Sequence, residues 1–188
     1  MNRDYDRLLG DLARTLGAVD PAETRALVRA LADARAVFVA GAGRSGLLGR
    51  AFAMRLAHLG LRVHAAGDAT TPAIGAGDLL LACSGSGKTE AVLSMAVRAR
   101  QAGARVALVT GAIIAPLTQV AHQRVLLPPI IPAAAQRAEP PDPDAFFQPM
   151  RTLFEQALLL FLDRVTLDLM DALGVSPQDM ERRHSNLE

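Results

Sequence analysis

Apolar residues along the chain fall into two alternating patterns. Short continuous apolar runs, several of them ending in glycine, are typical of strands buried inside a parallel sheet. Between these runs, apolar residues recur at helical spacing. The predicted strands cover 36–43, 61–67, 78–87, 104–111 and 124–129, and the predicted helices cover 3–17, 21–33, 47–59, 89–101, 115–121 and 150–173. Strands that alternate with helices through short connections predict an α/β fold with a doubly wound, flavodoxin-like parallel sheet covered on both faces.

The distribution of proline divides the chain into regions of one domain. A length of 188 residues suits a single domain with a substantial core. Seven of the eleven prolines fall within 128–149, which we interpret as an extended loop. Two helices within 1–34 precede the first strand, while a long helix at 150–173 and a tail at 174–188 follow the loop. We therefore expect residues 1–188 to form one domain.

Composition and charge narrow the classes of function. The formal net charge is +1 and no basic residues cluster, so we expect no nucleic-acid partner. The single cysteine, Cys83, cannot form an internal disulfide, which is consistent with a reducing cytosol. The first residues lack the apolar core of a secretion signal, and no uncharged apolar stretch is long enough to cross a membrane. These features predict a cytoplasmic protein without a membrane partner.

The first glycine-rich loop, GAGRSG (41–46), stands between a predicted strand and a predicted helix. Its three glycines match the G-x-G-x-x-G spacing of dinucleotide-binding loops. Asp68 follows near the end of the second strand and could contact a ribose, so NAD binding is an open alternative. Ser45 lies at the carboxyl end of the first strand, where neighbouring strand ends converge on one crevice. We predict that Ser45 contacts the ligand; the alternative is a helix N-cap.

The second glycine-rich loop, CSGSGKTE (83–90), resembles the end of an ATP-binding phosphate loop. However, Ala82 replaces the first glycine of that motif, and no acidic residue ends an apolar strand to hold Mg²⁺. The loop instead combines hydroxyl groups with exposed backbone N–H groups at the positive end of a predicted helix, which makes a metal-free anion site. The predicted phosphate ligands are Ser84, Gly85, Ser86, Gly87, Lys88 and Thr89. A turn followed by a helix cap is the alternative.

Glu155 is the most informative carboxylate in the sequence. On the long C-terminal helix it shares a face with Leu158 and Leu162. A carboxylate on an apolar face is unfavourable unless it is exposed, paired or functional. We interpret Glu155 as a general base. The alternative is a surface ion pair with Arg151, one helical turn earlier.

Five segments together give the chain a family resemblance. They are GAGRSG, FAMRLAHLG, GDLLLACSGSGKT, QPMRTLFEQALLLFLD and the terminal HSNLE. Over about residues 35–188 the chain resembles the 6-phospho-3-hexuloisomerases of the sugar isomerase (SIS) domain superfamily. The resemblance implies a three-layer α/β/α sandwich with a five-stranded parallel sheet. It also implies interconversion of D-arabino-hex-3-ulose 6-phosphate and D-fructose 6-phosphate through an enediol, in the ribulose monophosphate pathway of formaldehyde fixation.

The resemblance also implies roles for individual residues. The LFEQ segment makes Glu155 the proton acceptor, and the superfamily places Ser45 near the sugar phosphate. Distant SIS isomerases use a C-terminal histidine, often from a neighbouring subunit, which makes His184 a second catalytic candidate. His58 is more consistent with packing at an interface. The family forms oligomers, so we expect a homodimer or homotetramer with sites near the subunit interfaces.

Other functions stay open at this point. The four histidines are isolated from carboxylates at ligand spacing, so we predict no metal and no other cofactor. Another SIS isomerase, acting on a pentose or heptose phosphate, would fit the same phosphate loops. A non-catalytic sugar-phosphate sensor would keep the loops without a base, and we expect no attached DNA-binding domain because only about 35 residues precede the first strand. A nucleotide-binding protein is disfavoured by Ala82.

Overall fold

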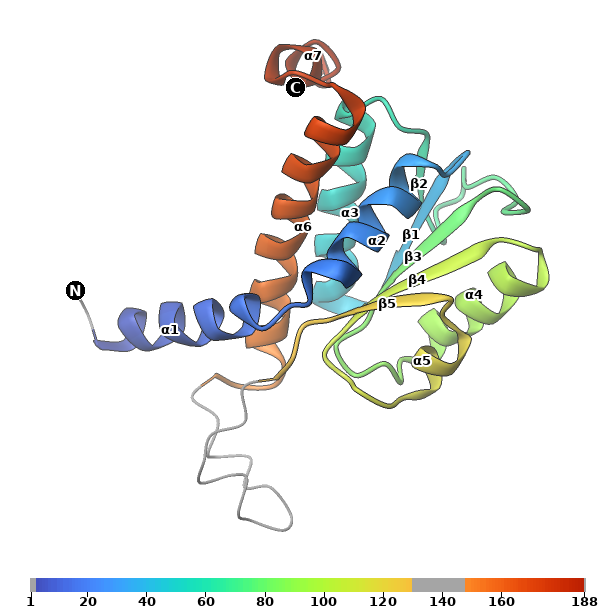
Figure 1. The fold of residues 1–188 in the computed structure, drawn as a ribbon. Helices are drawn as coiled ribbons and strands as arrows, with labels where there is room; N and C mark the ends of the chain where they lie inside the picture. The colour runs from blue at the N-terminus through green and yellow to red at the C-terminus, as the bar shows by residue number, and fades with distance from the viewer. Residues whose placement is uncertain (1–2, 130–147, 188) are drawn as a thin grey trace.

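The computed structural model describes residues 3–129 and 148–187, and Figure 1 shows their arrangement. A single five-stranded sheet forms the centre, with strand order β2-β1-β3-β4-β5 and every neighbouring pair parallel. The strands are β1 (Val37–Gly41), β2 (Val63–Ala65), β3 (Leu79–Cys83), β4 (Arg105–Thr110) and β5 (Gln123–Leu126). The predicted α/β class and the five-stranded parallel sheet are therefore confirmed.

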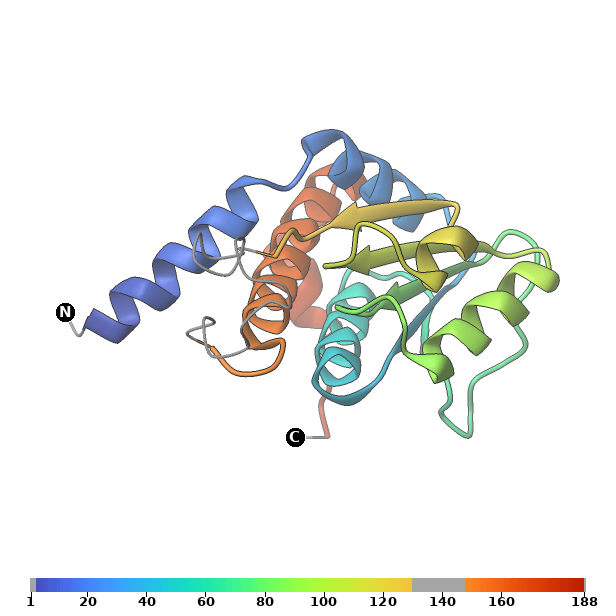
Figure 2. The ribbon, with the colours of Figure 1, turned by 90° about the horizontal axis from the view of Figure 1, so that it is seen from below.

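Helices cover both faces of the sheet, as continuous apolar strands require. The helices are α1 (Arg3–Gly17), α2 (Pro21–Ala32), α3 (Gly43–His58), α4 (Glu90–Gln101), α5 (Pro116–Val120), α6 (Thr152–Leu173) and α7 (Pro177–Arg182). Side chains of α2, α3 and α6 share one core cluster with alternate strand residues, while α4 and α5 pack on the opposite face. Figures 1 and 2 show α1 projecting away from the sheet beside the first turns of α6. None of the helices in the described ranges is long and apolar enough to cross a membrane.

The strand order creates a crevice at the carboxyl ends of β1 and β3. From β1 the chain turns outward to β2, whereas β3 is followed by β4 and β5 on the other side. Gly41 and Cys83 are paired residues at the ends of these two central strands. Open α/β sheets bind ligands at such a point, where the connections diverge. Both glycine-rich loops begin there.

The helix α6 follows directly from its apolar pattern. Leu158, Phe161, Leu162 and Val165 are buried at successive i, i+3 and i+4 positions against α2 and α3. Gly174 ends the helix with a left-handed backbone, φ 64°, and its N–H bonds to Met170 and Asp171. The helix begins at Thr152 rather than at the predicted 150. Most of the proline-rich segment, 130–147, lies outside the described residues.

The ends of two other elements differ from the sequence-based expectation. The helix predicted at 47–59 begins already at Gly43, because the glycine-rich loop itself forms the first helical turn. The tail predicted at 174–188 contains α7, which the apolar pattern did not indicate because none of its residues is buried. Its signal was a capping box, in which Ser176 and Asp179 satisfy each other's backbone N–H groups.

Candidate active site

The glycines after β1 allow the strand and the next helix to pack closely. A Cβ atom at Gly41 would lie 2.8 Å from the Cα of Gly46, and a Cβ atom at Gly46 would lie 2.7 Å from the carbonyl oxygen of Gly41. Gly43 has a left-handed backbone, φ 55°. The helix α3 therefore begins at Gly43, with Ala42 at the N-cap position. Ser45 lies inside the first turn and is half-buried. The helix-cap alternative for Ser45 is wrong.

The loop after β3 is held together by its own hydroxyl groups. Ser84 is 3% exposed, and its Oγ lies 3.2 Å from the Oγ1 of Thr89 and accepts a hydrogen bond from the N–H of Gly87. The Oγ of Ser86 accepts from the N–H of Lys88 at 3.1 Å. Lys88 itself is exposed. The loop is thus a preformed turn, and it precedes the positive end of α4.

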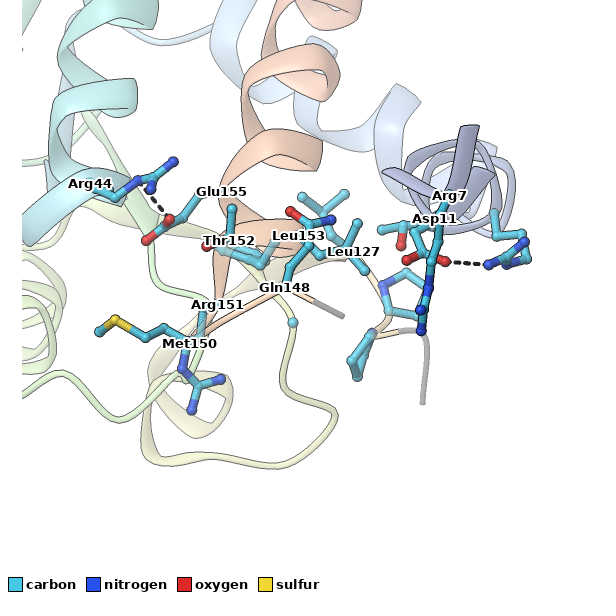
Figure 3. Close-up of a pocket in the computed structure, with 17 residues that line it drawn as sticks. Arg7, Asp11, Arg44, Leu127, Gln148, Met150, Arg151, Thr152, Leu153 and Glu155 are labelled. Carbon is cyan, nitrogen blue, oxygen red and sulfur yellow. Dashed lines mark hydrogen bonds and ion pairs between the residues drawn. The ribbon is translucent and has the colours of Figure 1, made fainter. Parts of the chain in front are cut away.

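Glu155 lies in the first turn of α6, and its carboxylate meets an arginine from α3. The Nε of Arg44 is 2.8 Å from the Oε2 of Glu155, and the Glu155 side chain is 16% exposed. Figure 3 shows the two side chains pointing toward each other. The alternative predicted from the sequence, an ion pair of Glu155 with Arg151, is wrong, because the partner of Glu155 is Arg44 from another helix.

A cavity of about 750 Å³ lies beside this pair. Among the predicted site residues, Gly85 and Glu155 line it, together with Arg44. The cavity runs from the Arg44–Glu155 pair toward Arg7 on α1 (Figure 3). It therefore joins the glycine-rich loop after β3, through Gly85, to the predicted base.

The α1 end of the cavity was not predicted from the sequence. Arg7, Arg14 and Thr15 on α1 and Gln148 before α6 line this end. The hydroxyl of Thr15 and the amide of Gln148 are buried without a hydrogen-bond partner among the described residues. The sequence shows only the amphipathic pattern of α1, and that pattern gives no indication that the helix reaches the site.

His184 lies far from Glu155 within one chain. It follows α7, and its ring contacts that of buried His58, with 5.1 Å between the ring centroids. Arg183 next to it donates a hydrogen bond to the carbonyl of His58 at 3.0 Å. Glu155 lies near the opposite end of α6, whose 22 residues span roughly 33 Å. A single chain therefore does not bring the two predicted catalytic residues together.

Comparison with known proteins identifies the family of this fold and site. The family model of the SIS domain matches residues 30–134, which include both glycine-rich loops. The chain belongs to the SIS domain family. Its sequence is 44% identical over 178 residues to a 3-hexulose-6-phosphate isomerase from Mycobacterium gastri, covering 95% of this chain and 86% of the relative.

Two further proteins similar to this SIS protein are also described as 3-hexulose-6-phosphate isomerases, one by name and one by inference from its structure. A 3-hexulose-6-phosphate isomerase from Bacillus subtilis is 35% identical over 181 residues, covering 96% of this chain and 95% of the relative. A solved structure from Methanococcus jannaschii, for which the molecular function of 3-hexulose-6-phosphate isomerase was inferred, superimposes with a TM-score of 0.81 at 29% identity. That match covers 96% of this chain and 98% of the other. The resemblance predicted from the sequence is confirmed.

Asp68 and Cys83 are not among the residues that line the cavity of this SIS protein. Asp68, the candidate ribose ligand, forms an ion pair with Arg50. Cys83 is fully buried at the end of β3, and burial raises the pKa of its thiol to about 12, so it is a core residue. In the described part of the chain, no three His, Cys, Asp or Glu side chains group so that they could hold a metal ion.

Proposed function

We propose that this SIS protein interconverts D-arabino-hex-3-ulose 6-phosphate and D-fructose 6-phosphate, as an isomerase of the ribulose monophosphate pathway. The observation that carries the proposal is the pairing of Glu155 with Arg44 beside a cavity that also includes Gly85 of the phosphate loop. Relatives named as this isomerase, 35–44% identical over nearly the whole chain, support the choice of substrate.

The serine-rich loop holds the phosphate in this proposal. Ser84, Ser86 and Thr89 present hydroxyl groups, and the first N–H groups of α4 have no partner inside the helix. Ser45 adds a hydroxyl from the first turn of α3 at the neighbouring strand end. Binding energy at the phosphate would then align the reacting carbons with Glu155.

Glu155 transfers the proton between adjacent carbons. Its carboxylate removes the proton from C2 of the hex-3-ulose, and the electron pair moves through a C2–C3 double bond onto the C3 oxygen. The resulting enediolate takes the proton back at C3, while the C2 hydroxyl proton passes to the C3 oxygen. C2 thereby becomes the carbonyl of fructose 6-phosphate and C3 carries a hydroxyl group. The positive charge of Arg44, at 2.8 Å from the carboxylate, lies close enough to stabilise the enediolate oxygens. The chemistry balances without an oxidant or a cofactor.

The polar groups at the α1 end suit the hydroxyl groups of a sugar. A buried hydroxyl or amide without a partner is unfavourable, so Thr15 and Gln148 would gain from hydrogen bonds to the polyol chain. The same groups would discriminate against a substrate with fewer hydroxyl groups, because they would then stay unsatisfied.

A second subunit completes the site in this proposal. Because His184 lies beyond the end of α6 that is opposite to Glu155, we infer that it acts on the substrate of a neighbouring subunit. Exposed apolar side chains on α3 and α6, namely Leu47, Met54, Leu160 and Leu167, provide a surface for a symmetric homodimer or homotetramer. The cytoplasmic location predicted from the sequence stays a prediction.

The deciding experiment compares substrates in a buffer containing a metal chelator. We expect rapid conversion of hex-3-ulose 6-phosphate to fructose 6-phosphate, and much slower conversion of pentose and heptose phosphates. Preferred conversion of a pentose or heptose phosphate would assign the protein to a different SIS isomerase. Binding of phosphosugars without conversion of any of them would indicate a sensor.

A further inference from the structure

The side chain of Phe154 occupies a slot that is lined by Gly85 and Gly111 and that depends on the missing Cβ atom of Gly85. A Cβ atom at Gly85, in the phosphate loop, would lie 2.7 Å from Cδ1 of the Phe154 ring. A Cβ atom at Gly111, just after β4, would lie 3.4 Å from Cδ2 on the other edge of the ring. Any larger residue at Gly85 would therefore displace the ring.

Gly85 and Gly111, which line the slot, are also hydrogen-bonded to each other. The N–H of Gly111 donates a hydrogen bond to the carbonyl of Gly85 at 3.2 Å. The phosphate loop and the end of β4 thus form one wall, and the Phe154 ring packs against it. A change in the position of Gly85 would displace the ring, since close-packed groups transmit displacement.

The contact between Phe154 and the loop can affect Glu155, because the two residues are adjacent in the sequence. Phe154 immediately precedes Glu155 in the first turn of α6, and the residue at the N-cap, Arg151, makes no side-chain capping hydrogen bond. Thr152 donates hydrogen bonds to the carbonyl of Pro149 at the start of the helix. Beyond them, the first turn is held by the Phe154 ring on one side and by the Arg44–Glu155 ion pair on another. The carboxylate is therefore located by packing against the phosphate loop.

We propose that Phe154 is a positioning residue that couples occupancy of the phosphate loop to the placement of Glu155. This inference rests on the proposed function, because it takes Glu155 as the base and the serine-rich loop as the phosphate site. A bound phosphate further restrains the preformed loop, the loop restrains Gly85, and the ring restrains the turn that carries the carboxylate. The substrate's phosphate would then contribute to turnover as well as to affinity.

The first test compares two Phe→Leu variants on one helix. Phe154→Leu removes the flat ring from the slot, and Phe161→Leu, two turns later in the same core cluster, is the matched control. For Phe154→Leu we expect kcat to fall about tenfold or more with KM changed less than about threefold, because small displacements of a catalytic group reduce rates strongly. For the control we expect nearly normal kcat. Equal kinetic losses in the two variants would overturn the proposal.

The second test is a double-mutant cycle with Gly85→Ala. The added methyl group displaces the ring in the wild-type background. A leucine at residue 154 is smaller and more flexible than the ring, so we expect it to move aside at a lower cost. We therefore expect Gly85→Ala to lower kcat far less in the Phe154→Leu background than in the wild type. The same factor in both backgrounds would show that the loop and the base act independently.

A third measurement does not depend on turnover. Hydrogen–deuterium exchange of the first turn of α6 is followed with and without inorganic phosphate. We expect phosphate to slow exchange at this turn in the wild type and not in Phe154→Leu. If the wild type lacks isomerase activity but shows this protection, the proposed function fails while the coupling holds. If phosphate protects the turn equally in both proteins, the coupling fails whatever the activity.

Discussion

Arg44 and Glu155 come from the first turns of two different helices, and 2.8 Å separates the Nε of one from the Oε2 of the other. A cation in the first turn of a helix is electrostatically unfavourable, and α3 has no acidic residue there to offset it. Glu155 supplies the missing negative charge across the gap between α3 and α6. An arrangement that violates a local rule and is satisfied only in tertiary structure is typical of a functional site.

Replacing Arg44 tests whether this pair orients the carboxylate. In Arg44→Ala the carboxylate loses its ionic partner, so we expect kcat to fall by about 10- to 100-fold, the range for a misplaced catalytic group. Arg44→Lys keeps the charge and should retain more activity than Arg44→Ala. Steady-state kinetics of both variants check this, with Arg50→Ala, which breaks the nearby pair with Asp68, as the control. Full activity in Arg44→Ala would contradict the role.

Glu155→Gln tests the base directly. The amide keeps the shape of the side chain but cannot accept a proton from carbon, so turnover should fall by about 10²–10⁴. Binding of fructose 6-phosphate should change little, because the proposed phosphate ligands lie in the serine-rich loop. Exchange of the substrate C2 or C3 proton with deuterated water, followed by NMR, measures the step itself. Asp163→Asn, an exposed change on the same helix, is the control. Exchange at the wild-type rate in Glu155→Gln would exclude it as the base.

The fold was predictable because its signals are local and repeated. Each of the apolar runs at β1, β3 and β4 is buried on both faces, and the glycines or polar residues that follow them mark the carboxyl ends where ligands bind. The start of α3 was misplaced because glycines normally indicate a loop, whereas Gly41 and Gly46 here allow close packing of the strand against a helix.

The candidate site was only partly predictable, because its geometry depends on tertiary contacts. Glu155 could be identified from its place on an apolar helical face, but its partner Arg44 could not, since nothing in the local pattern links the two residues. The contribution of α1, through Arg7 and Thr15, depends on the angle at which that helix leaves the core. The separation of His184 from Glu155 likewise emerges only once α6 is placed.

Ser86→Ala tests the serine-rich loop as the phosphate site. The Oγ of Ser86 accepts a hydrogen bond from the N–H of Lys88. A bound phosphate oxygen would compete with this hydroxyl for the N–H of Lys88. We expect binding of fructose 6-phosphate to weaken by about 1–3 kcal/mol, the range for hydrogen bonds to a charged group. Ser94→Ala, an exposed change on α4, serves as the control. Calorimetry should also detect no binding of ATP with Mg²⁺, and tight ATP binding would refute this interpretation of the loop.

A buried carboxylate away from the site predicts how stability depends on pH. Asp78 is 2% exposed and accepts hydrogen bonds from Arg35 at 2.8 and 2.9 Å and from the N–H of Gly75. The side-chain hydrogen bond from Arg35 is the main reason that the pKa of Asp78 is lowered, against the opposing effect of burial. The ionised form is therefore favoured by folding, and its contribution is present above the ordinary aspartate pKa of about 3.9.

Asp78→Asn should accordingly lower the free energy of unfolding by about 1.5–3 kcal/mol at neutral pH, as expected for lost hydrogen bonds to a charged group. As the pH falls below about 4 and through the lowered pKa, the wild type loses the same contribution, so the difference between the two proteins should shrink. Urea unfolding at several pH values measures this difference. A difference that stays constant from neutral pH to about pH 3 would show that ionisation of Asp78 contributes nothing.

The separation of His184 from Glu155 leads to a test of subunit sharing. If His184 acts on the substrate of a neighbouring subunit, Glu155→Gln and His184→Ala are each nearly inactive as pure oligomers. Co-refolding of the two variants would place an intact Glu155 beside an intact His184 in some mixed sites, and in a homodimer half of the proteins would be mixed, with one competent site each. We therefore expect activity to reappear at about a quarter of the wild-type level, by the symmetry of an isologous interface. His184→Ala protein that is already fully active would remove the histidine from the mechanism. Mixed oligomers that remain inactive would show that the two residues must come from the same chain, which would require the tail after α7 to leave its contact with His58.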